Sequence, residues 1–369
     1  MTTNVTCFDM AGAGDVSSLE RWLESQPLAR LRRLAVFAKT EGHHSPNDFS
    51  RDLLKLKLDE LFMRLGITDR ALSMLAIGSE GVGSPKGFAF ADFADPPETP
   101  GAAPVAPGTA NRNAPARLAL GTARSDTVPI ADIGTLALVD RVAETARAAM
   151  RDAHLAPDQV RLLMIKSPLL AARHPAATPA NSTMHRGRGI SALGGGVALG
   201  EVDRNRLTEE SITRDLSIYA KHVQGITGAE ITRIEVIAMG NRPGAGGDLR
   251  IATTHTRDIL DQRSIRALLA KEGFQFDAFG ELLDGNRIEA LIAKTMVAED
   301  CMVRGSRTIV YTSSWAPESH IRAAASGVLG SLLGHLRFFV SADSVHQAPE
   351  GGGVTTVVFR DGACAVATA

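Results

Sequence analysis

The sequence predicts an α/β fold made of three similar repeat units around a pseudo-threefold axis, with inward-facing sheets and outer helices. An apolar strand that ends on a lysine occurs three times, at intervals of about 128 residues, and the lysines are Lys39, Lys166 and Lys294. Each lysine is followed by an arginine at the opening of a helix. Each helix then leads to a second apolar strand that breaks into a small-residue loop.

The three units are predicted to span residues 1–103 (unit A), 104–247 (unit B) and 248–369 (unit C). Each unit opens with a strand, a turn that contains Asp and then a helix. The openings read "CFDMAGAGDVSSLERWL", "LALGTARSDTVPIADIG" and "LRIATTHTRDILDQRSIRALL". A shared order of elements indicates an internal repeat rather than three unrelated segments.

The lysine-ending strands follow in "LAVFAKTEG", "VRLLMIKSPLL" and "RIEALIAKTMV". A single lysine at the end of a strand ordinarily marks the point where the chain re-enters water. Three equivalent lysines on sheets that face inward would instead meet at the axis. The repetition therefore predicts one shared central site.

The helices after these strands carry Arg51 in "SRDLLKLKLDELF", Arg188 in "GRGISALGGGVALG" and Arg322 in "IRAAASGVLGSLLGH". The second strands with their loops read "LSMLAIGSEGVGSP", "RIEVIAMGNRPGAGG" and "LRFFVSADSVHQAPEGGG". We expect the arginines and the small-residue loops to surround the lysines.

Two stretches break this regular order. Residues 94–116 are rich in Pro, Ala and Gly and lack periodicity, which predicts an extended linker. Residues 172–189 are predicted to form a surface loop or flap.

Composition excludes several classes of function. Forty Lys and Arg residues against 41 Asp and Glu residues give a net charge of -1, so no basic surface for nucleic acid is expected. The scattered cysteines Cys7, Cys301 and Cys364 have neither disulfide nor metal-ligand spacing. No apolar stretch approaches the ~18 residues of a membrane helix. We expect a cytoplasmic protein that binds a small molecule and contacts no membrane.

The motifs "KTEG", "IKSPLL", "RGISALG" and "VSADSVHQAPEGGG" resemble, in this order along the whole chain, the cyanuric acid hydrolase and barbiturase family of ring-opening amidohydrolases. The resemblance implies three similar units around a pseudo-threefold axis and a homotetramer. It implies a site of three serine and lysine pairs with one arginine per unit, which binds a planar, carbonyl-rich ring. The nucleophile would be the second-unit serine, activated by the second-unit lysine.

Carried over residue by residue, the resemblance gives an uneven site. All three lysines are present, and Arg51 and Arg188 match family arginines. Arg322 lies in the matching helix, although the anchoring arginine aligns nearer Ser319. Three loop residues complete the expected substrate contacts: Gly78, Gly240 and Ala342.

The serines are the main departure. Ala76 takes the first-unit position, with Ser79 close by, and Arg242 is aligned with the second-unit nucleophile. Only Ser341 is kept. A guanidinium stays protonated and cannot replace a nucleophilic hydroxyl.

Three functions therefore remain open. In the first, Ser341 and Lys294 open a cyclic amide while Lys39 and Lys166 hold its oxygens, which requires that burial and nearby cations lower the pKa of Lys294. In the second, a more cationic pocket that includes Arg242 binds an anionic, carboxylated molecule and uses a lysine as base or nucleophile. In the third, the protein binds such a molecule without catalysis.

No catalytic cofactor is expected. A structural divalent cation, Mg or Ca, is a candidate at the C-terminal Gly-rich loop, where the resemblance implies a ligand Glu just after the third lysine. Met296 occupies that place here and Glu299 follows three residues later. His43 and His44 lack a third metal ligand at suitable spacing, and "GSEGVGSPKG" lacks the order of a phosphate-binding P-loop.

Overall fold

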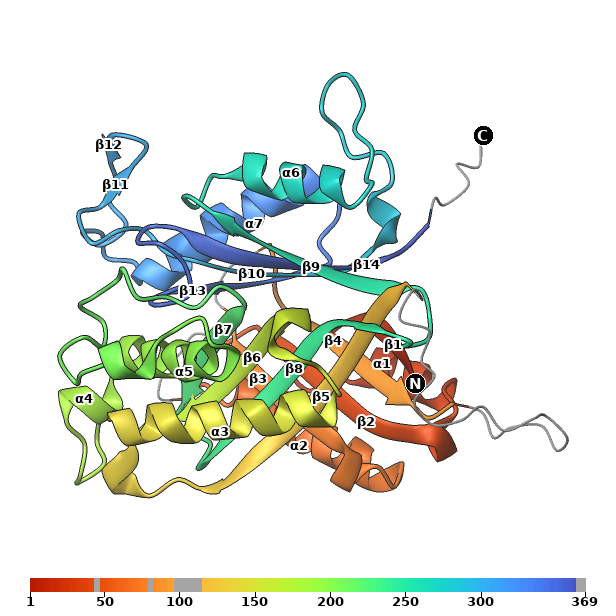
Figure 1. Cartoon of the computed structure of the whole chain (residues 1–369), viewed down its shortest axis with the longest axis horizontal. Helices are drawn as coiled ribbons and strands as arrows, with labels where there is room; N and C mark the ends of the chain where they lie inside the picture. The colour runs from red at the N-terminus through yellow and green to blue at the C-terminus, as the bar shows by residue number, and fades with distance from the viewer. Residues whose placement is uncertain (43–46, 79–81, 96–114, 363–369) are drawn as a thin grey trace, which may run out of the picture.

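The computed structural model describes residues 1–42, 47–78, 82–95 and 115–362. These residues form three four-stranded sheets, helices on their outer sides and one short hairpin (Figure 1). Unit A contains β1 (Thr2–Asp9), α1 (Ser17–Glu24), β2 (Leu31–Thr40), α2 (Ser50–Arg64), β3 (Ala71–Ile77) and β4 (Lys86–Phe93).

Unit B has the same order of elements, with a short additional helix. It contains β5 (Ala116–Thr127), α3 (Leu136–Asp152), β6 (Val160–Pro168), α4 (Pro179–Ser182), α5 (Met184–Leu199), β7 (Val223–Gly228) and β8 (Arg233–Pro243).

Unit C repeats the order again and adds the hairpin. It contains β9 (Leu249–Thr256), α6 (Gln262–Lys271), β10 (Ile288–Thr295), β11 (Met302–Val303), β12 (Ser306–Arg307), α7 (Pro317–Leu333), β13 (Phe338–Ala342) and β14 (Gly353–Arg360). Single turns of 3₁₀-helix are found at Leu28–Arg30, Thr68–Arg70, Ile130–Asp132, Pro157–Gln159, Arg204–Arg206 and Gly285–Arg287.

The three large sheets share one topology. Their strand orders are β1-β4-β2-β3, β5-β8-β6-β7 and β9-β14-β10-β13, so in each unit the first strand is followed by the fourth, the second and the third. The second and third strands pair in parallel, and the other pairs are antiparallel. The predicted fold class of three similar repeat units is confirmed.

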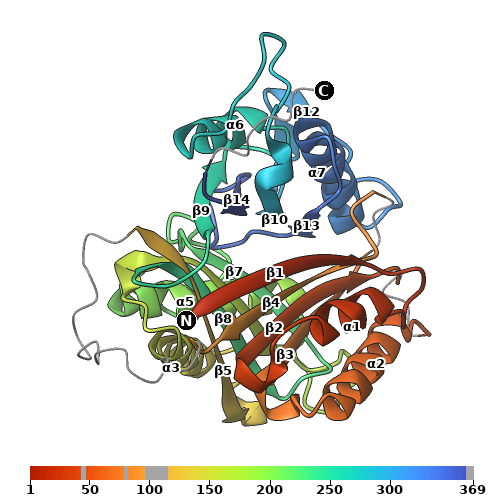
Figure 2. The same cartoon turned by 90° about the vertical axis from the view of Figure 1, so that its right-hand side faces the viewer.

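Each sheet packs its two faces differently. In β2, Leu34 and Val36 pack with the helices of unit A, while Ala35 and Phe37 point the other way. Period-two alternation of this kind places two apolar rows on opposite faces of a strand. The second row meets the corresponding rows of the other sheets in one central core, and Phe37 contacts Phe339 of unit C edge to face at 5.5 Å between ring centroids. Figures 1 and 2 show the helices outside and the sheets facing inward, as predicted.

Several sequence predictions need correction or fall outside the described residues. The predicted strand "RIEVIAMGNRPGAGG" is β8, the fourth strand of unit B, whereas the third strand is β7 in "VQGITG". The predicted loop at 172–189 contains α4 and the start of α5. Most of the linker at 94–116, and with it the predicted unit boundary at 103/104, lies outside the described residues. The boundary at 247/248 lies between β8 and β9.

In the part of the chain that the structure describes, no helix is long and apolar enough to cross a membrane.

Candidate active site

The three lysines extend the inward-facing rows of their strands. Ala35 and Phe37 lie in the central core, and the next residue on that face of β2 is Lys39. The same step of two leads from Met164 to Lys166, and from Ile292 to Lys294. Alternation along a strand therefore brings all three lysines to the axis, where each is at most 3% exposed.

Each lysine reaches across to the third strand of another unit. The Nζ of Lys166 donates to the carbonyl of Leu75 at 2.7 Å. The Nζ of Lys39 donates to the carbonyl of Val340, and that of Lys294 to the carbonyl of Gly225. Unit A thus contacts unit C, unit B contacts unit A and unit C contacts unit B. These three equivalent hydrogen bonds therefore follow the pseudo-threefold symmetry of the three units.

The residue after each of these carbonyls occupies an equivalent position in the three units. These residues are Ala76, Ile226 and Ser341, and each lies directly opposite the lysine of its own unit in the parallel strand pair. Within this chain, the counterpart of Ser341 in unit B is therefore Ile226. The structure corrects the prediction that placed Arg242 there, because Arg242 lies on β8.

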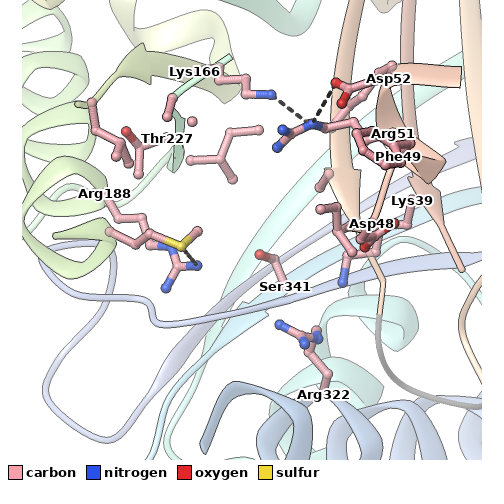
Figure 3. A pocket seen from close by; sticks show the side chains of 18 residues that line it. Lys39, Asp48, Phe49, Arg51, Asp52, Lys166, Arg188, Thr227, Arg322 and Ser341 are labelled. Carbon is pink, nitrogen blue, oxygen red and sulfur yellow. Dashed lines mark hydrogen bonds and ion pairs between the residues drawn. The ribbon is translucent and has the colours of Figure 1, made fainter. Parts of the chain in front are cut away.

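A cavity of about 370 Å³ opens over this axis. Figure 3 shows side chains from different elements pointing into it, among them Lys166, Arg51, Arg188, Arg322 and Ser341. The arginines reach it because α2, α5 and α7 follow the lysine strands and carry these residues in their first two turns. The full lining is Lys39, Asp48, Phe49, Arg51, Asp52, Leu75, Ala76, Ile77, Lys166, Leu169, Met184, Arg188, Ile226, Thr227, Gly228, Ala229, Arg322 and Ser341.

A carboxylate that was not predicted, Glu230, holds two of these cations together. Its Oε1 accepts from Lys166 Nζ, and its Oε2 lies 3.1 Å from Arg51 Nη1. Burial alone would raise the pKa of Glu230, but Lys166 and then Arg51 bring this pKa below its usual value. The ionised carboxylate therefore bridges unit A and unit B. The sequence contains a signal for Glu230: "ITGAE" in unit B and "AIGSE" in unit A both place a Gly at the third position and a Glu at the fifth.

A second acidic group, Asp343, holds the arginine of unit B. Its Oδ2 lies 2.9 Å from Arg188 Nη1, and its Oδ1 lies 2.9 Å from His185 Nδ1. Glu318 also approaches Arg188, at 3.4 Å. Burial opposes ionisation of Asp343, yet its hydrogen bond with His185 and the charge of Arg188 hold its pKa well below the usual range. The same hydrogen bond raises the pKa of His185.

Lys294 differs from the other two lysines. It does not appear in the lining of the cavity, and its side chain is completely buried. Burial, followed by the charge of Arg188, lowers its pKa well below the usual value for lysine, with Lys39 and Arg322 acting in the same direction. The amine next to Ser341 in the sheet is therefore held towards its neutral form.

Four of the predicted contact residues lie away from the cavity lining. Arg242 pairs with Arg117 in the β5 and β8 ladder, and burial lowers its pKa there. Gly240 packs against the Gln159 carbonyl. Gly78 donates its N–H to the Thr40 carbonyl at 2.9 Å. Ala342 belongs to a separate apolar cluster of unit C with Val297, Val303, Val310 and Ile321.

Nothing in the structure tests the predicted divalent cation at the C-terminal Gly-rich loop. Met296 and Glu299 line a second cavity of about 320 Å³ together with His185, Tyr311, Glu318 and Asp343. A thioether does not suit Mg or Ca, which prefer oxygen ligands. Among the described residues, no group of three or more His, Cys, Asp or Glu side chains could hold a metal ion. The cation stays a prediction. Ser79, His43 and His44 lie outside the described residues.

Comparison with known proteins decides the family. Residues 4–360 match the amidohydrolase ring-opening protein family (Amido_AtzD_TrzD). The chain belongs to this family. The cyanuric acid amidohydrolase of Methylobacterium sp. (strain 4-46) is 34% identical over 367 residues, covering 95% of each chain. Barbiturase 1 of Nocardioides sp. (strain ATCC BAA-499 / JS614) is 29% identical over 364 residues, covering 93% of this chain and 95% of that protein.

Solved structures of the ring-opening amidohydrolase family agree with the fold. The cyanuric acid hydrolase from A. caulinodans has a TM-score of 0.83 at 27% identity, covering 98% of this chain and 99% of that chain. Another cyanuric acid hydrolase has a TM-score of 0.84 at 29% identity, covering 97% and 99%. The predicted resemblance to this family is confirmed.

Proposed function

We propose that the protein hydrolyses a cyclic amide or imide by opening its ring at a C–N bond, with Ser341 as the nucleophile. Family membership supports the reaction class, since the relatives include cyanuric acid amidohydrolases and a barbiturase. The observation that carries the proposal is the position of Ser341. It is the one hydroxyl among the three equivalent residues, and it lines the same cavity as Lys39 and Lys166.

In the proposed reaction, Ser341 Oγ attacks a ring carbonyl and its proton passes to the neutral amine of Lys294 on the neighbouring strand. The carbonyl π bond becomes an alkoxide, which Lys39 stabilises as an adjacent cation. When the alkoxide collapses, the ring C–N bond breaks and the leaving nitrogen takes the proton from Lys294. Water then attacks the acyl-serine ester, which releases the carboxylic acid and restores Ser341.

The arginines orient the ring before this step. Arg51 is held by Glu230 and Arg188 by Asp343, so both guanidinium groups are fixed without the substrate. Because these donors are already fixed, no free energy is lost in ordering them during the reaction. Removing a single donor of this kind typically lowers kcat about 10²- to 10³-fold.

The second candidate is an enzyme or binding protein for an anionic, carboxylated ring in the same cavity. The loss of hydroxyls at Ala76 and Ile226 favours it. However, Glu230 and Asp343 already pair with Lys166, Arg51 and Arg188, which lowers the positive charge left for an anion.

A single set of assays tests the proposal. Purified protein is incubated with cyanuric acid, barbituric acid, glutarimide and a carboxylated cyclic imide, and ring opening is followed by liquid chromatography with mass spectrometry. We expect Ser341→Ala to abolish turnover of every ring that the wild type opens. The matched control is Ser73→Ala. Ser73 is 6% exposed and Ser341 is 9% exposed, but Ser73 lies on the face of β3 that packs against the helices, whereas Ser341 lies on the inward face of β13. Saturable binding of the carboxylated imide without any turnover would support the second candidate instead.

We further propose a homotetramer located in the cytoplasm, as the family resemblance implies. Light scattering after size-exclusion chromatography tests the assembly, and a monomer at micromolar concentration would contradict it.

A further inference from the structure

The three corners of the cavity are not chemically equivalent. Each corner combines a lysine with the residue that follows the carbonyl it binds: Lys39 with Ser341, Lys166 with Ala76, and Lys294 with Ile226. We call them the serine, alanine and isoleucine corners. A ring that sits on the pseudo-threefold axis must present one edge to each corner.

The serine and alanine corners offer polar groups to a ligand. Ser341 and Lys39 both line the cavity at the first. At the second, Lys166 lines the cavity, and its bridge through Glu230 places Arg51 beside it.

The isoleucine corner presents hydrocarbon beside one cation, Arg188, which pairs with Asp343 through Nη1 and donates to Met184 Sδ through Nη2. Ile226 lines the cavity, whereas Lys294 is fully buried and donates to the Gly225 carbonyl. The neighbouring Thr227 also lines the cavity, but its hydroxyl donates to the Ser167 carbonyl at 2.8 Å. A hydrocarbon side chain therefore stands where the other corners present a hydroxyl or an ammonium group.

Other apolar side chains of unit B widen this corner. Leu169 and Met184 line the same cavity, and the Leu169 N–H bonds to the Gly228 carbonyl, two residues beyond Ile226. Together, Ile226, Leu169 and Met184 form what we call the unit B apolar wall. A ring carbonyl in contact with these hydrocarbon side chains gains no hydrogen bond from them, whereas an alkyl group there would be removed from water.

We propose that the substrate is a cyclic amide or imide that presents an amide edge to Ser341 and a hydrocarbon substituent to the unit B apolar wall. This inference rests on the proposed function, because it names the substrate class of the same site. A ring with three identical polar edges, such as cyanuric acid, has no hydrocarbon group to place against this wall. The cavity of about 370 Å³ is near the lower limit for small-molecule sites, so the substituent is small.

The test compares matched rings that differ in one edge. Dihydrouracil is paired with 5,5-dimethyldihydrouracil, and glutarimide with 3,3-dimethylglutarimide, so that both members of each pair are neutral at pH 7. For the wild type, we expect kcat/KM to be about 10- to 100-fold higher for the alkylated member of at least one pair. One unsatisfied polar group, or one small alkyl group removed from water, typically changes kcat/KM by about this factor. Equal or higher kcat/KM for both unsubstituted rings would overturn the inference.

Two substitutions at Ile226 connect the preference to the wall. Ile226→Ser restores a hydroxyl at the third corner, so we expect it to lower kcat/KM for the alkylated ring and raise it for the unsubstituted ring. Ile226→Val keeps a hydrocarbon of similar shape and should keep the order of preference. An unchanged ratio in Ile226→Ser would refute the role of the wall.

Binding separates this inference from the proposed function. Dissociation constants of the same four rings are measured by calorimetry with Ser341→Ala, which removes the proposed nucleophile and leaves the wall intact. Tighter binding of the alkylated rings supports the inference even if no ring is hydrolysed by the wild type, a result that would overturn the proposed function alone. Weaker binding of the alkylated rings overturns the inference even if ring opening is found.

Discussion

Glu230 offers the sharpest test of how the site is held together, because, among the residues that the structure describes, its carboxylate joins Lys166 to Arg51. The perturbation is Glu230→Gln, which keeps the size of the side chain and removes its charge. The Lys166 side chain is only 4% exposed, so the substitution removes the charged partner of a buried ammonium group, which keeps its hydrogen bond to the Leu75 carbonyl.

The expected loss of stability follows from this burial. Removing one partner of a fully buried ion pair costs about 3–5 kcal/mol. Glu230 is 21% exposed and Arg51 25% exposed, so solvent reduces the cost, and we expect a loss of about 2–3 kcal/mol at pH 7. Urea unfolding followed by circular dichroism measures it.

A neighbouring carboxylate supplies the matched control. Glu235 lies opposite Lys166 in the β6 and β8 ladder and is as buried as Glu230, but desolvation raises its pKa above the usual value. Its ionised form contributes little, so Glu235→Gln should cost less than about 1 kcal/mol. Equal losses for Glu230→Gln and Glu235→Gln, or a loss below about 0.5 kcal/mol for Glu230→Gln, would refute the bridging role.

The pH dependence gives an independent check of the same bridge. The pKa of Glu230 is lowered in the folded state, so its stabilising effect is present above the unfolded value near 4.5 and is lost as pH falls through the lower, folded value. The stability difference between wild type and Glu230→Gln should therefore shrink as pH falls below about 4.5.

Three further predictions concern Lys294 and Asp343. Because the base must be neutral, kcat/KM should rise with pH through the lowered pKa of Lys294 and reach a plateau below 10.5, and a first rise only near 10.5 would contradict this. In the unfolded chain Lys294 has its ordinary pKa near 10.5, whereas burial lowers this pKa in the folded protein, so the unfolded chain binds the proton more readily. Between the lowered pKa and 10.5, the stability of wild type relative to Lys294→Met should therefore increase by up to about 1.4 kcal/mol per pH unit. A difference that stays constant with pH in denaturation experiments would refute this. Asp343→Asn removes the nearer of the two carboxylates that hold Arg188, and Asn tolerates the positive φ of +67° at this residue. We therefore expect KM to rise about tenfold or more, and an unchanged KM would show that the pairing of Arg188 with Asp343 is not needed.

Much of the fold could be predicted because its signal is local and repeated. The strands that end on Lys39, Lys166 and Lys294 are strongly apolar, and their even spacing indicates three units without knowledge of any long-range contact. The alternation that points each lysine inward also belongs to the strand itself.

The site was harder to predict because the third strand of unit B has a weak local pattern. Its sequence "VQGITG" contains two glycines and polar residues, while the fourth strand "RIEVIAMG" is longer and more apolar. The fourth strand was therefore assigned to the site, which placed Arg242 where Ile226 lies. The ion pairs of Glu230 and Asp343 link residues more than 60 positions apart, so no local pattern specifies them.

The central claim is that Ser341 forms the covalent intermediate of ring opening. The most direct measurement is mass spectrometry of protein quenched with acid during turnover of the best ring substrate, followed by peptide mapping. The account predicts a mass increase equal to the whole opened ring on the peptide that contains Ser341, and its absence in Ser341→Ala. Full ring-opening activity in Ser341→Ala, or an adduct on a lysine instead, would contradict it.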